Sequence, residues 1–245
     1  MFTDRNKALH LFGNWLADVI FPKFCLSCNK EGQHVCPDCF NKIKINSFPI
    51  CYKCEKRSPN SQTCAKCKQE TTLDGLVVAG LWEDDLLRQM VYEFKYRFIK
   101  ELKKELGQTL INYTKIHYKT LINNNTIFSF IPLNKRRQIW RGFNQAKLLA
   151  KEASSCFDLP LVDLLERKRN TSPQAEVKSQ SARKNNVRQA FAIKETTDYP
   201  LSFFKGKTII LVDDICTTGA TLEECAKTLK PLKPKEIWGL VLARG

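Results

Sequence analysis

Short apolar runs and longer amphipathic stretches alternate along the chain and predict an α/β fold. Four runs that are apolar at nearly every position predict strands at Leu76–Trp82, Ile127–Ile131, Ile209–Val212 and Ile237–Leu242. Strands without a polar face are typical of parallel sheets that helices cover on both sides. We therefore expect a central, mainly parallel sheet flanked by helices.

Helical spacing marks several stretches outside these runs. Between Asp84 and Gln108, apolar residues recur at helical spacing and predict one or two helices. Two further helices are expected at Asn144–Ser154 and Leu222–Leu229. Leu9–Phe24 predicts an amphipathic helix that packs on the rest of the protein, and a helix lying on a membrane surface is the alternative.

Eight of the eleven cysteines form four Cys-x-x-Cys pairs within the first 67 residues. The pairs are Cys25 and Cys28, Cys36 and Cys39, Cys51 and Cys54, and Cys64 and Cys67. One such turn brings two sulfurs to an ion, and two turns complete a tetrahedral zinc site. Repeated pairs indicate metal ligands rather than disulfides. The sequence therefore predicts two structural zinc ions.

The cysteines also predict the domain boundaries. We expect an N-terminal helix over residues 1–24, a double zinc ribbon over 25–70 and an α/β domain over 71–245. Sequential pairing, in which the first four cysteines hold one zinc ion and the last four the other, is the expected arrangement. A crossed pairing of first with third and second with fourth pairs is the alternative.

The net charge of +15 makes polyanions reasonable partners. Basic residues lie among the ribbon cysteines, with Phe40, Phe48 and Tyr52 available for stacking. This mixture suits single-stranded nucleic acid, and it suits a purely structural zinc domain equally well. No apolar segment is long enough to span a membrane, and the N-terminus lacks the features of a secretory signal. The expected location is the cytoplasm.

The stretch Thr208–Thr221 carries the clearest chemical signal. Its apolar strand leads into Asp213 and Asp214, then into small and hydroxyl residues, and then into a predicted helix. A loop between a strand and a helix points backbone N–H groups and a helix dipole at an anion, so a phosphate fits there. The two carboxylates would repel the phosphate and are better suited to the hydroxyls of a sugar that carries it.

The run Val212–Thr221 resembles the ribose-5-phosphate motif of type I phosphoribosyltransferases. The resemblance implies that a loop holds the 5-phosphate of phosphoribosyl pyrophosphate (PRPP), while Asp213 and Asp214 take the 2- and 3-hydroxyls as the catalytic pair. It also implies magnesium bound with PRPP. The loop residues are Cys216, Thr217, Thr218, Gly219, Ala220 and Thr221.

A second polar loop, Pro132–Gln145, also lies between a predicted strand and a predicted helix. Ligands of open α/β sheets collect at the carboxyl ends of the strands, so both loops would face one crevice. The basic residues of this loop would balance the charge of a leaving pyrophosphate. A generic basic loop, or a nucleic-acid patch that includes Trp140 and Phe143, is the alternative. The expected pyrophosphate-binding residues are Leu133, Asn134, Lys135, Arg136 and Arg137.

Arg141–Gln145 (Arg-Gly-Phe-Asn-Gln), together with the cysteines and the acidic pair, resembles the ComF family of competence-associated phosphoribosyltransferase-like proteins. Phe94–Tyr96 and Arg169–Gln174 are also similar to that family, and the likeness spans about Phe21–Arg244. The resemblance implies a type I phosphoribosyltransferase fold behind a double zinc ribbon. It also implies a link to natural transformation and DNA uptake.

The segment Arg167–Gln189 is long, basic and poor in apolar residues, which is typical of functional or mobile loops. In phosphoribosyltransferases the corresponding segment closes over the bound diphosphate and excludes water. The resemblance therefore implies a flexible loop over the site. Its candidate residues are Arg169, Gln174, Arg183 and Lys184.

Two functions follow from these features. In the first, the protein binds PRPP and either transfers or senses the 5-phosphoribosyl group, with magnesium pyrophosphate as leaving group and an acceptor that the sequence does not identify. In the second, a non-catalytic protein binds single-stranded DNA through its zinc ribbons and basic loops. DNA-uptake or recombination proteins would be partners in either case. Retention of both carboxylates favours the first function.

Overall fold

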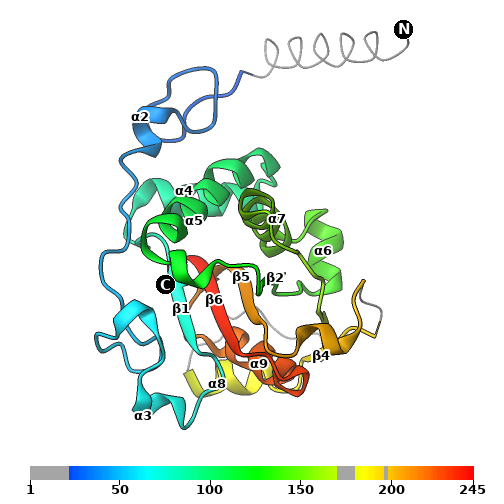
Figure 1. Cartoon of the computed structure of the whole chain (residues 1–245). Helices are drawn as coiled ribbons and strands as arrows, with labels where there is room; N and C mark the ends of the chain where they lie inside the picture. Colours follow the sequence, from blue (N-terminus) through cyan, green and yellow to red (C-terminus); the bar gives the residue numbers. More distant parts are fainter. Residues whose placement is uncertain (1–21, 170–179, 196–197) are drawn as a thin grey trace, which may run out of the picture. The chain divides into compact units, whose positions relative to one another are not determined.

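The computed structural model describes residues 22–169, 180–195 and 198–245 (Figure 1). The chain divides into two compact units, one ending at Ile43 and the other running from Lys44 to Gly245. The helix predicted over residues 1–24 falls almost wholly outside the described residues. Residues 44–70, which we predicted as part of a zinc-ribbon domain, belong to the larger unit together with the sheet.

The smaller unit is built around one pair of Cys-x-x-Cys turns. Phe24 and Glu31 form an antiparallel bridge, and inside that turn the N–H of Asn29 donates to the carbonyl of Cys25 at 2.9 Å. Asn29 has a left-handed φ of 60°, which closes the turn. The second Cys-x-x-Cys turn begins the short helix α2 (Pro37–Phe40).

The larger unit begins with the same arrangement. Ile50 and Arg57 form the bridge, and the N–H of Glu55, at φ 61°, donates to the carbonyl of Cys51 at 2.9 Å. The segment continues through η1 (Pro59–Ser61) and α3 (Ala65–Lys68). Two identical turn geometries show that the chain contains the same cysteine-rich ribbon twice.

The central sheet has four parallel strands in the order β1-β6-β5-β2. They are β1 (Gly75–Val78), β2 (Thr126–Phe130), β5 (Thr208–Cys216) and β6 (Glu236–Arg244). All four predicted strands are confirmed, but β1 ends before Trp82. Strand β5 is longer than predicted and includes the acidic pair, which therefore lies in the last part of a strand rather than after it.

Helices cover both faces of this sheet (Figure 1). On one side lie α4 (Asp85–Tyr96), α5 (Lys103–His117) and α7 (Gln145–Phe157), and on the other lies α9 (Ala220–Leu229). Short 3-10 turns connect them: η2 (Lys100–Leu102), η3 (Lys119–Leu121), η5 (Leu201–Phe204) and η6 (Lys230–Leu232). Phe98, with a left-handed φ of 60°, interrupts the predicted 84–108 helix and separates α4 from the next turn. The predicted fold class is confirmed.

The segment after β2 corrects one prediction. We expected an irregular loop there, but residues Lys135–Arg141 form the helix α6. The side chain of Asn134 accepts a hydrogen bond from the N–H of Arg136 at 2.9 Å and so caps the helix, while Gly142 ends it with a left-handed φ of 72°. This helix carries several basic side chains at fixed angles.

The long basic segment contains more structure than predicted. Strands β3 (Leu165–Arg167) and β4 (Phe191–Ile193) form a separate antiparallel pair, and α8 (Gln180–Val187) lies between them in sequence. Helix α9 packs against both α8 and β4. The segment is therefore partly helical rather than structureless. Among the residues that the structure describes, no helix is both long and apolar enough to cross a bilayer.

Candidate functional site

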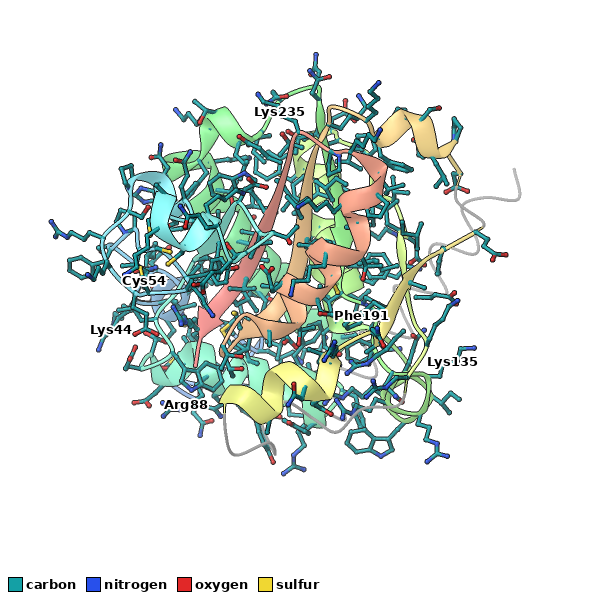
Figure 2. All side chains as sticks on the ribbon, turned by 90° about the horizontal axis from the view of Figure 1, so that it is seen from below. Lys44, Cys54, Arg88, Lys135, Phe191 and Lys235 are labelled. Atoms are coloured by element: carbon teal, nitrogen blue, oxygen red, sulfur yellow. The ribbon has the colours of Figure 1, made fainter. Side chains whose placement is uncertain are left out.

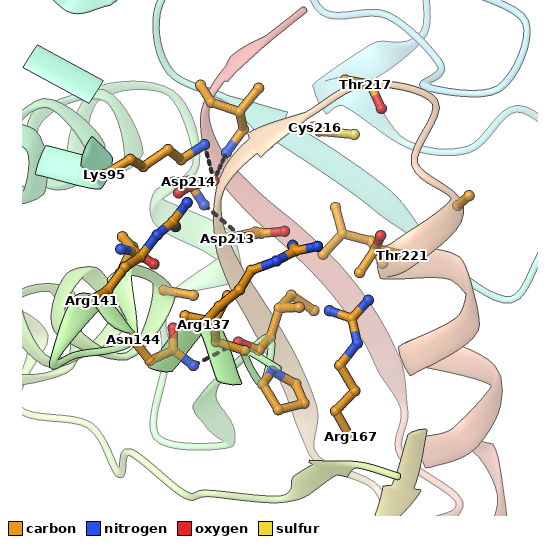
Figure 3. Close-up of a pocket in the computed structure, with 18 of the residues that line it drawn as sticks. Lys95, Arg137, Arg141, Asn144, Arg167, Asp213, Asp214, Cys216, Thr217 and Thr221 are labelled. Atoms are coloured by element: carbon orange, nitrogen blue, oxygen red, sulfur yellow. Dashed lines mark hydrogen bonds and ion pairs between the residues drawn. The ribbon is translucent and has the colours of Figure 1, made fainter. Parts of the chain in front are cut away.

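A pocket of about 530 Å³ opens at the carboxyl ends of β2 and β5, where the sequence predicted a crevice (Figure 3). These strands are neighbours in the sheet, because Phe130 pairs with Val212. The pocket is lined by the residues following both strands and by parts of α4, α6 and β3. The two polar segments singled out in the sequence therefore meet in one cavity.

Asp213 and Asp214 both line this pocket but have different surroundings. The N–H of Asp214 donates to Asp213 Oδ1 at 2.9 Å, and the N–H of Ile215 donates to Asp214 Oδ1 at 2.7 Å. Successive side chains of a strand point to opposite faces. Figure 3 shows the result: Asp214 is directed towards Lys95 of α4, and Asp213 towards the start of α9.

Lys95 forms an ion pair with the acidic motif. Its Nζ lies 2.9 Å from Asp214 Oδ1, and both side chains are largely buried. Burial and the charge of Asp214 together raise the pKa of Asp213 to about 7, although the Lys95 ammonium opposes the rise. A carboxyl group with a pKa near neutrality accepts or releases a proton under ordinary conditions.

The hydroxyl-rich loop leads directly into α9. Residues Thr217–Thr221 and the first turn of the helix line the pocket, so the positive end of the α9 dipole lies at its wall. Gly219 is the N-cap and has a left-handed φ of 78°. Cys216 is 5% exposed, and burial raises the pKa of its thiol to about 12. This thiol fills the turn and is a poor nucleophile.

Basic side chains converge on the pocket from three elements. They are Lys95 of α4, Arg137 and Arg141 of α6, and Arg167 of β3. Burial and the nearby Arg137 guanidinium lower the pKa of Arg167, while Asp213 counteracts the effect. Four cations against two carboxylates leave an excess of positive charge, which suits a ligand that carries several negative charges.

The predicted pyrophosphate-binding residues separate into two groups. Leu133 and Arg137 line the pocket. Asn134 is instead buried as the cap of α6, and Lys135 and Arg136 are exposed and outside the lining. Figure 2 shows Lys135 at the outer surface of the domain. The helical geometry of α6 explains the split, since only one of its faces turns towards the sheet.

Aromatic residues hold Arg141 at the rim of the pocket. Its guanidinium carbon lies 5.3 Å from the ring centre of Tyr96 and 5.9 Å from that of Trp140. The Nε of Arg141 is buried and makes no hydrogen bond to any residue that the structure describes, and the same holds for Nε2 of Gln145. Both side chains line the pocket. They offer donors to a ligand.

The four predicted flexible-loop residues are unevenly described. Arg169 donates from its guanidinium to the carbonyl of Arg188 at 2.8 Å, so it braces the two ends of the segment. Gln174 lies outside the described residues. Arg183 and Lys184 belong to α8, and their side chains lie outside what the structure describes.

Each half of the cysteine-rich region forms a four-sulfur cluster. Cys25, Cys28, Cys36 and Cys39 make one, and Cys51, Cys54, Cys64 and Cys67 make the other. The sulfurs of Cys28 and Cys36 are 3.6 Å apart, and those of Cys54 and Cys64 are 3.8 Å apart. Sulfurs around a tetrahedral zinc ion are separated by about 3.8 Å. The clusters fit zinc and confirm the sequential pairing.

Two domain families match the chain. Residues 141–245 match the phosphoribosyl transferase domain, and residues 16–68 match the double zinc ribbon domain. Competence protein F of Haemophilus influenzae is 31% identical over 230 residues, which cover 89% of this chain and 96% of that protein. The chain belongs to the ComF family.

Other ComF-like relatives have similar coverage. Competence protein ComFC of Bacillus subtilis is 28% identical over 206 residues, covering 82% of this chain and 79% of that protein. DNA utilization protein YhgH of Escherichia coli K12 is 26% identical over 208 residues, covering 84% and 82%. Together with the four-sulfur clusters, the double zinc ribbon match identifies the two zinc ions of this ComF protein as structural.

Sequence reasoning missed several residues of the ComF pocket. Lys95, Arg141 and Gln145 lie in the two runs that carried the family resemblance, but none of them was among the expected binding residues. The resemblance to the ComF family was the signal that could have identified these three residues. The sequence contains no signal for Arg167 beyond its place at the start of a basic segment, because its position in the pocket depends on the pairing of β3 with β4.

Proposed function

We propose that this ComF protein binds PRPP in the pocket at the ends of β2 and β5. The observation that carries the proposal is the convergence in one cavity of an anion-binding loop, an acidic pair and an excess of cations. PRPP needs all three, because it joins a phosphate and a pyrophosphate through a sugar with two free hydroxyls. The match to the phosphoribosyl transferase domain supports the proposal.

The pocket has a distinct place for each part of PRPP. The loop Cys216–Thr221 receives the 5-phosphate at the start of α9. Asp213 and Asp214 accept hydrogen bonds from the ribose hydroxyls, with Asp214 held in place by Lys95. Arg137 and Arg167 bind the pyrophosphate, and the mutual repulsion of their guanidinium groups is relieved by the anion.

Transfer of the phosphoribosyl group would break the bond between C1 and the pyrophosphate oxygen and form a bond from C1 to an acceptor nucleophile. Positive charge grows on the ribose as that bond breaks, and the Asp213 carboxylate can balance it. The leaving pyrophosphate gains negative charge, which the arginines offset. The oxygen atoms of Asp213, Asp214 and the bound PRPP would hold magnesium, which would neutralise part of that charge.

The names of the relatives support a cellular role for this protein. Two of them are named competence proteins and a third a DNA utilization protein. We infer a role in the uptake or use of DNA in the cytoplasm, in which the protein transfers or senses the phosphoribosyl group. DNA-uptake or recombination proteins would be its partners.

Calorimetric titration with PRPP and magnesium tests the proposal. The wild-type protein should bind PRPP, and the double variant Asp213→Asn, Asp214→Asn should not. Asp163→Asn is the matched control, because Asp163 pairs with Lys194 outside the pocket lining. Arg137→Ala should weaken PRPP binding at least tenfold, whereas Lys135→Ala should leave it unchanged. Unaltered binding by the double variant would remove the proposal.

Exposed aromatic residues favour a second function, the binding of single-stranded nucleic acid. Tyr92, Tyr96 and Trp140 are 53%, 46% and 59% exposed, and they lie on α4 and α6 near basic side chains. Bases stack on exposed rings beside a cationic groove. The structure favours this rim over the zinc ribbons that the sequence suggested, where Phe24 and Phe48 are the exposed rings among the described residues.

Titration with labelled oligothymidylate at several salt concentrations tests the second function. Trp140→Ala should weaken binding, and Phe48→Ala should have little effect. Replacing exposed Lys135 and Arg136 with glutamate should reduce the slope of affinity against salt, since each phosphate contact contributes about 0.7 to it for a single strand. If Phe48→Ala is the more damaging change, the ribbon rather than the rim binds the strand.

A further inference from the structure

The second zinc ribbon covers the back of the phosphate loop. Tyr52 directly follows the zinc ligand Cys51 and is only 3% exposed. A Cβ atom placed on Gly219 would lie 2.9 Å from Cδ2 of the Tyr52 ring. The ring therefore packs directly on the one residue of the loop that adopts a left-handed conformation. Only glycine fits between this ring and the pocket.

The same tyrosine is tied to the first turn of α9. Its hydroxyl donates to Glu223 Oε2 at 2.7 Å. Glu223 also accepts from the N–H of Thr72 at 2.7 Å and from the N–H of Leu73 at 3.1 Å. Glu223 therefore links the start of α9 to the ribbon and to Thr72 and Leu73, which follow the ribbon in the sequence.

A third link reaches the other end of the loop. The Nε of Arg244 donates to the carbonyl of Thr217 at 3.2 Å, and the same guanidinium pairs with Glu55 at 2.8 Å. The N–H of Gly245 donates to the carbonyl of Cys216 at 3.0 Å. Glu55 belongs to the turn that carries Cys51 and Cys54. One end of the phosphate loop therefore contacts the zinc-binding turn directly through Tyr52, and the other end is linked to it through Arg244.

We propose that the second zinc centre, formed by Cys51, Cys54, Cys64 and Cys67, positions the phosphate loop of the neighbouring pocket, through Tyr52 and Glu223. We call these two residues, with Glu55 and Arg244, the back clamp. The inference rests on the proposed function, since it assigns the zinc centre a part in binding the 5-phosphate. The two zinc centres are then unequal, because the first lies in the other compact unit.

The physical reason is the small size of the ribbon. A cysteine-rich turn of this kind has few apolar residues and depends on its metal for a defined conformation. Tyr52 and Glu55 lie in the turn between and beside the ligands, so their positions follow the metal. When the turn relaxes, Gly219 loses its packing partner and Glu223 loses a donor. The loop amides are then no longer held in the arrangement that receives a phosphate.

Tyr52→Phe is the decisive variant, and Tyr118→Phe is its matched control. Tyr118 is also buried, and its hydroxyl shares a 2.7 Å hydrogen bond with Ser61 of the same ribbon, away from the pocket lining. Each change removes one hydroxyl that joins the ribbon to the domain. Tyr52→Phe should weaken binding of ribose 5-phosphate about tenfold, as expected for a hydrogen bond to a charged group. Tyr118→Phe should change it less than about twofold.

Binding of inorganic pyrophosphate provides the internal comparison. Its proposed partners, Arg137 and Arg167, belong to α6 and β3 and make no contact with the back clamp among the interactions that the structure describes. Tyr52→Phe should therefore leave pyrophosphate affinity unchanged. A general loss of stability would weaken both ligands, so equal effects on the two, or equal effects of the two tyrosine variants, would overturn the proposal.

Hydrogen exchange separates this inference from the proposed function. Amides of residues 217–221 should exchange faster in Tyr52→Phe than in Tyr118→Phe, with no ligand present. Cys54→Ser should release one zinc ion by metal analysis and accelerate the same amides, while Cys28→Ser should release one zinc ion without that effect. If the wild type fails to bind ribose 5-phosphate, the proposed function is wrong, but hydrogen exchange still tests whether the second zinc centre positions the phosphate loop. Equal exchange rates of these amides in all variants would refute that inference.

Discussion

Asp213 and Asp214 are adjacent in sequence and serve the pocket differently. Asp214 is compensated by the ammonium of Lys95, whereas Asp213 lies against the start of α9 with its pKa raised to about 7 by burial and by its neighbour. A cation close to one carboxylate and farther from the other lets both occupy a small space. The arrangement pairs one carboxyl group with a cation and leaves the other, Asp213, to titrate near neutrality.

The raised pKa of Asp213 predicts a pH-dependent effect of Asp213→Asn on stability. The folded-state pKa lies above the ordinary value, so the native protein binds this proton more tightly than the unfolded chain. Stability therefore falls as the pH rises from about 4 to 7 and stays reduced above 7. Asp213→Asn should be more stable than the wild type by about 1 kcal/mol or more at pH 8, with little difference near pH 4.

Denaturant unfolding of the ligand-free protein at several pH values measures this effect. Asp163→Asn, which alters a pair outside the pocket, is the control. A constant difference between Asp213→Asn and the wild type at every pH would contradict the assignment of the raised pKa.

At the scale of single elements, the short helix α6 decides which basic residues reach the ligand. It presents Arg137 and Arg141 to the pocket and leaves Lys135 and Arg136 exposed. A helix of seven residues has little stability of its own and depends on its ends. Asn134, which we expected to bind pyrophosphate, instead has a structural role in the capping hydrogen bond to the N–H of Arg136.

Asn134→Ala should therefore weaken ligand binding without removing any group from the pocket. Loss of the cap costs about 1 kcal/mol and frays the first turn of α6, which carries Arg137. We expect a fall in PRPP affinity of about fivefold by calorimetry and a lower melting temperature. Lys135→Ala in the same turn keeps the cap and should leave both unchanged. Equal behaviour of the two variants would show that the cap does not hold Arg137.

At the scale of the whole molecule, the two cysteine-rich ribbons are copies with different surroundings. Their turns share the same hydrogen bonds and the same left-handed residue, at Asn29 and at Glu55. One copy forms a compact unit, and the other is part of the larger unit that contains the sheet. The second ribbon differs from the first in that it packs on the phosphate loop through Tyr52.

Metal removal should affect the whole molecule. Metal analysis should find two zinc ions per chain, and removing them with a strong chelator should lower the melting temperature by about 5 °C or more. Restoring zinc should restore it, whereas magnesium alone should not, because thiolates prefer the softer ion. A single zinc ion per chain, or an unchanged melting temperature, would contradict the presence of two structural centres.

Features that depend on contiguous residues could be predicted from the sequence. Cysteine spacing predicted the two clusters, apolar runs predicted four strands, and the run from Val212 to Thr221 predicted a loop beside an acidic pair. Each of these features is formed by residues that are close together in the sequence, so the sequence pattern alone indicates it. It also predicted that two strand ends share one crevice, because parallel strands place their carboxyl ends together.

The contacts between side chains that are distant in the sequence became clear from the folded structure alone. Lys95 reaches Asp214 from α4, Arg167 enters the pocket from β3, and Tyr52 packs on Gly219 from a zinc ribbon. In the structure, two segments that we predicted as loops form the helices α6 and α8. Such contacts depend on how whole elements pack against one another, and no short window of sequence records that packing. The chemistry of the pocket arises from these long-range contacts.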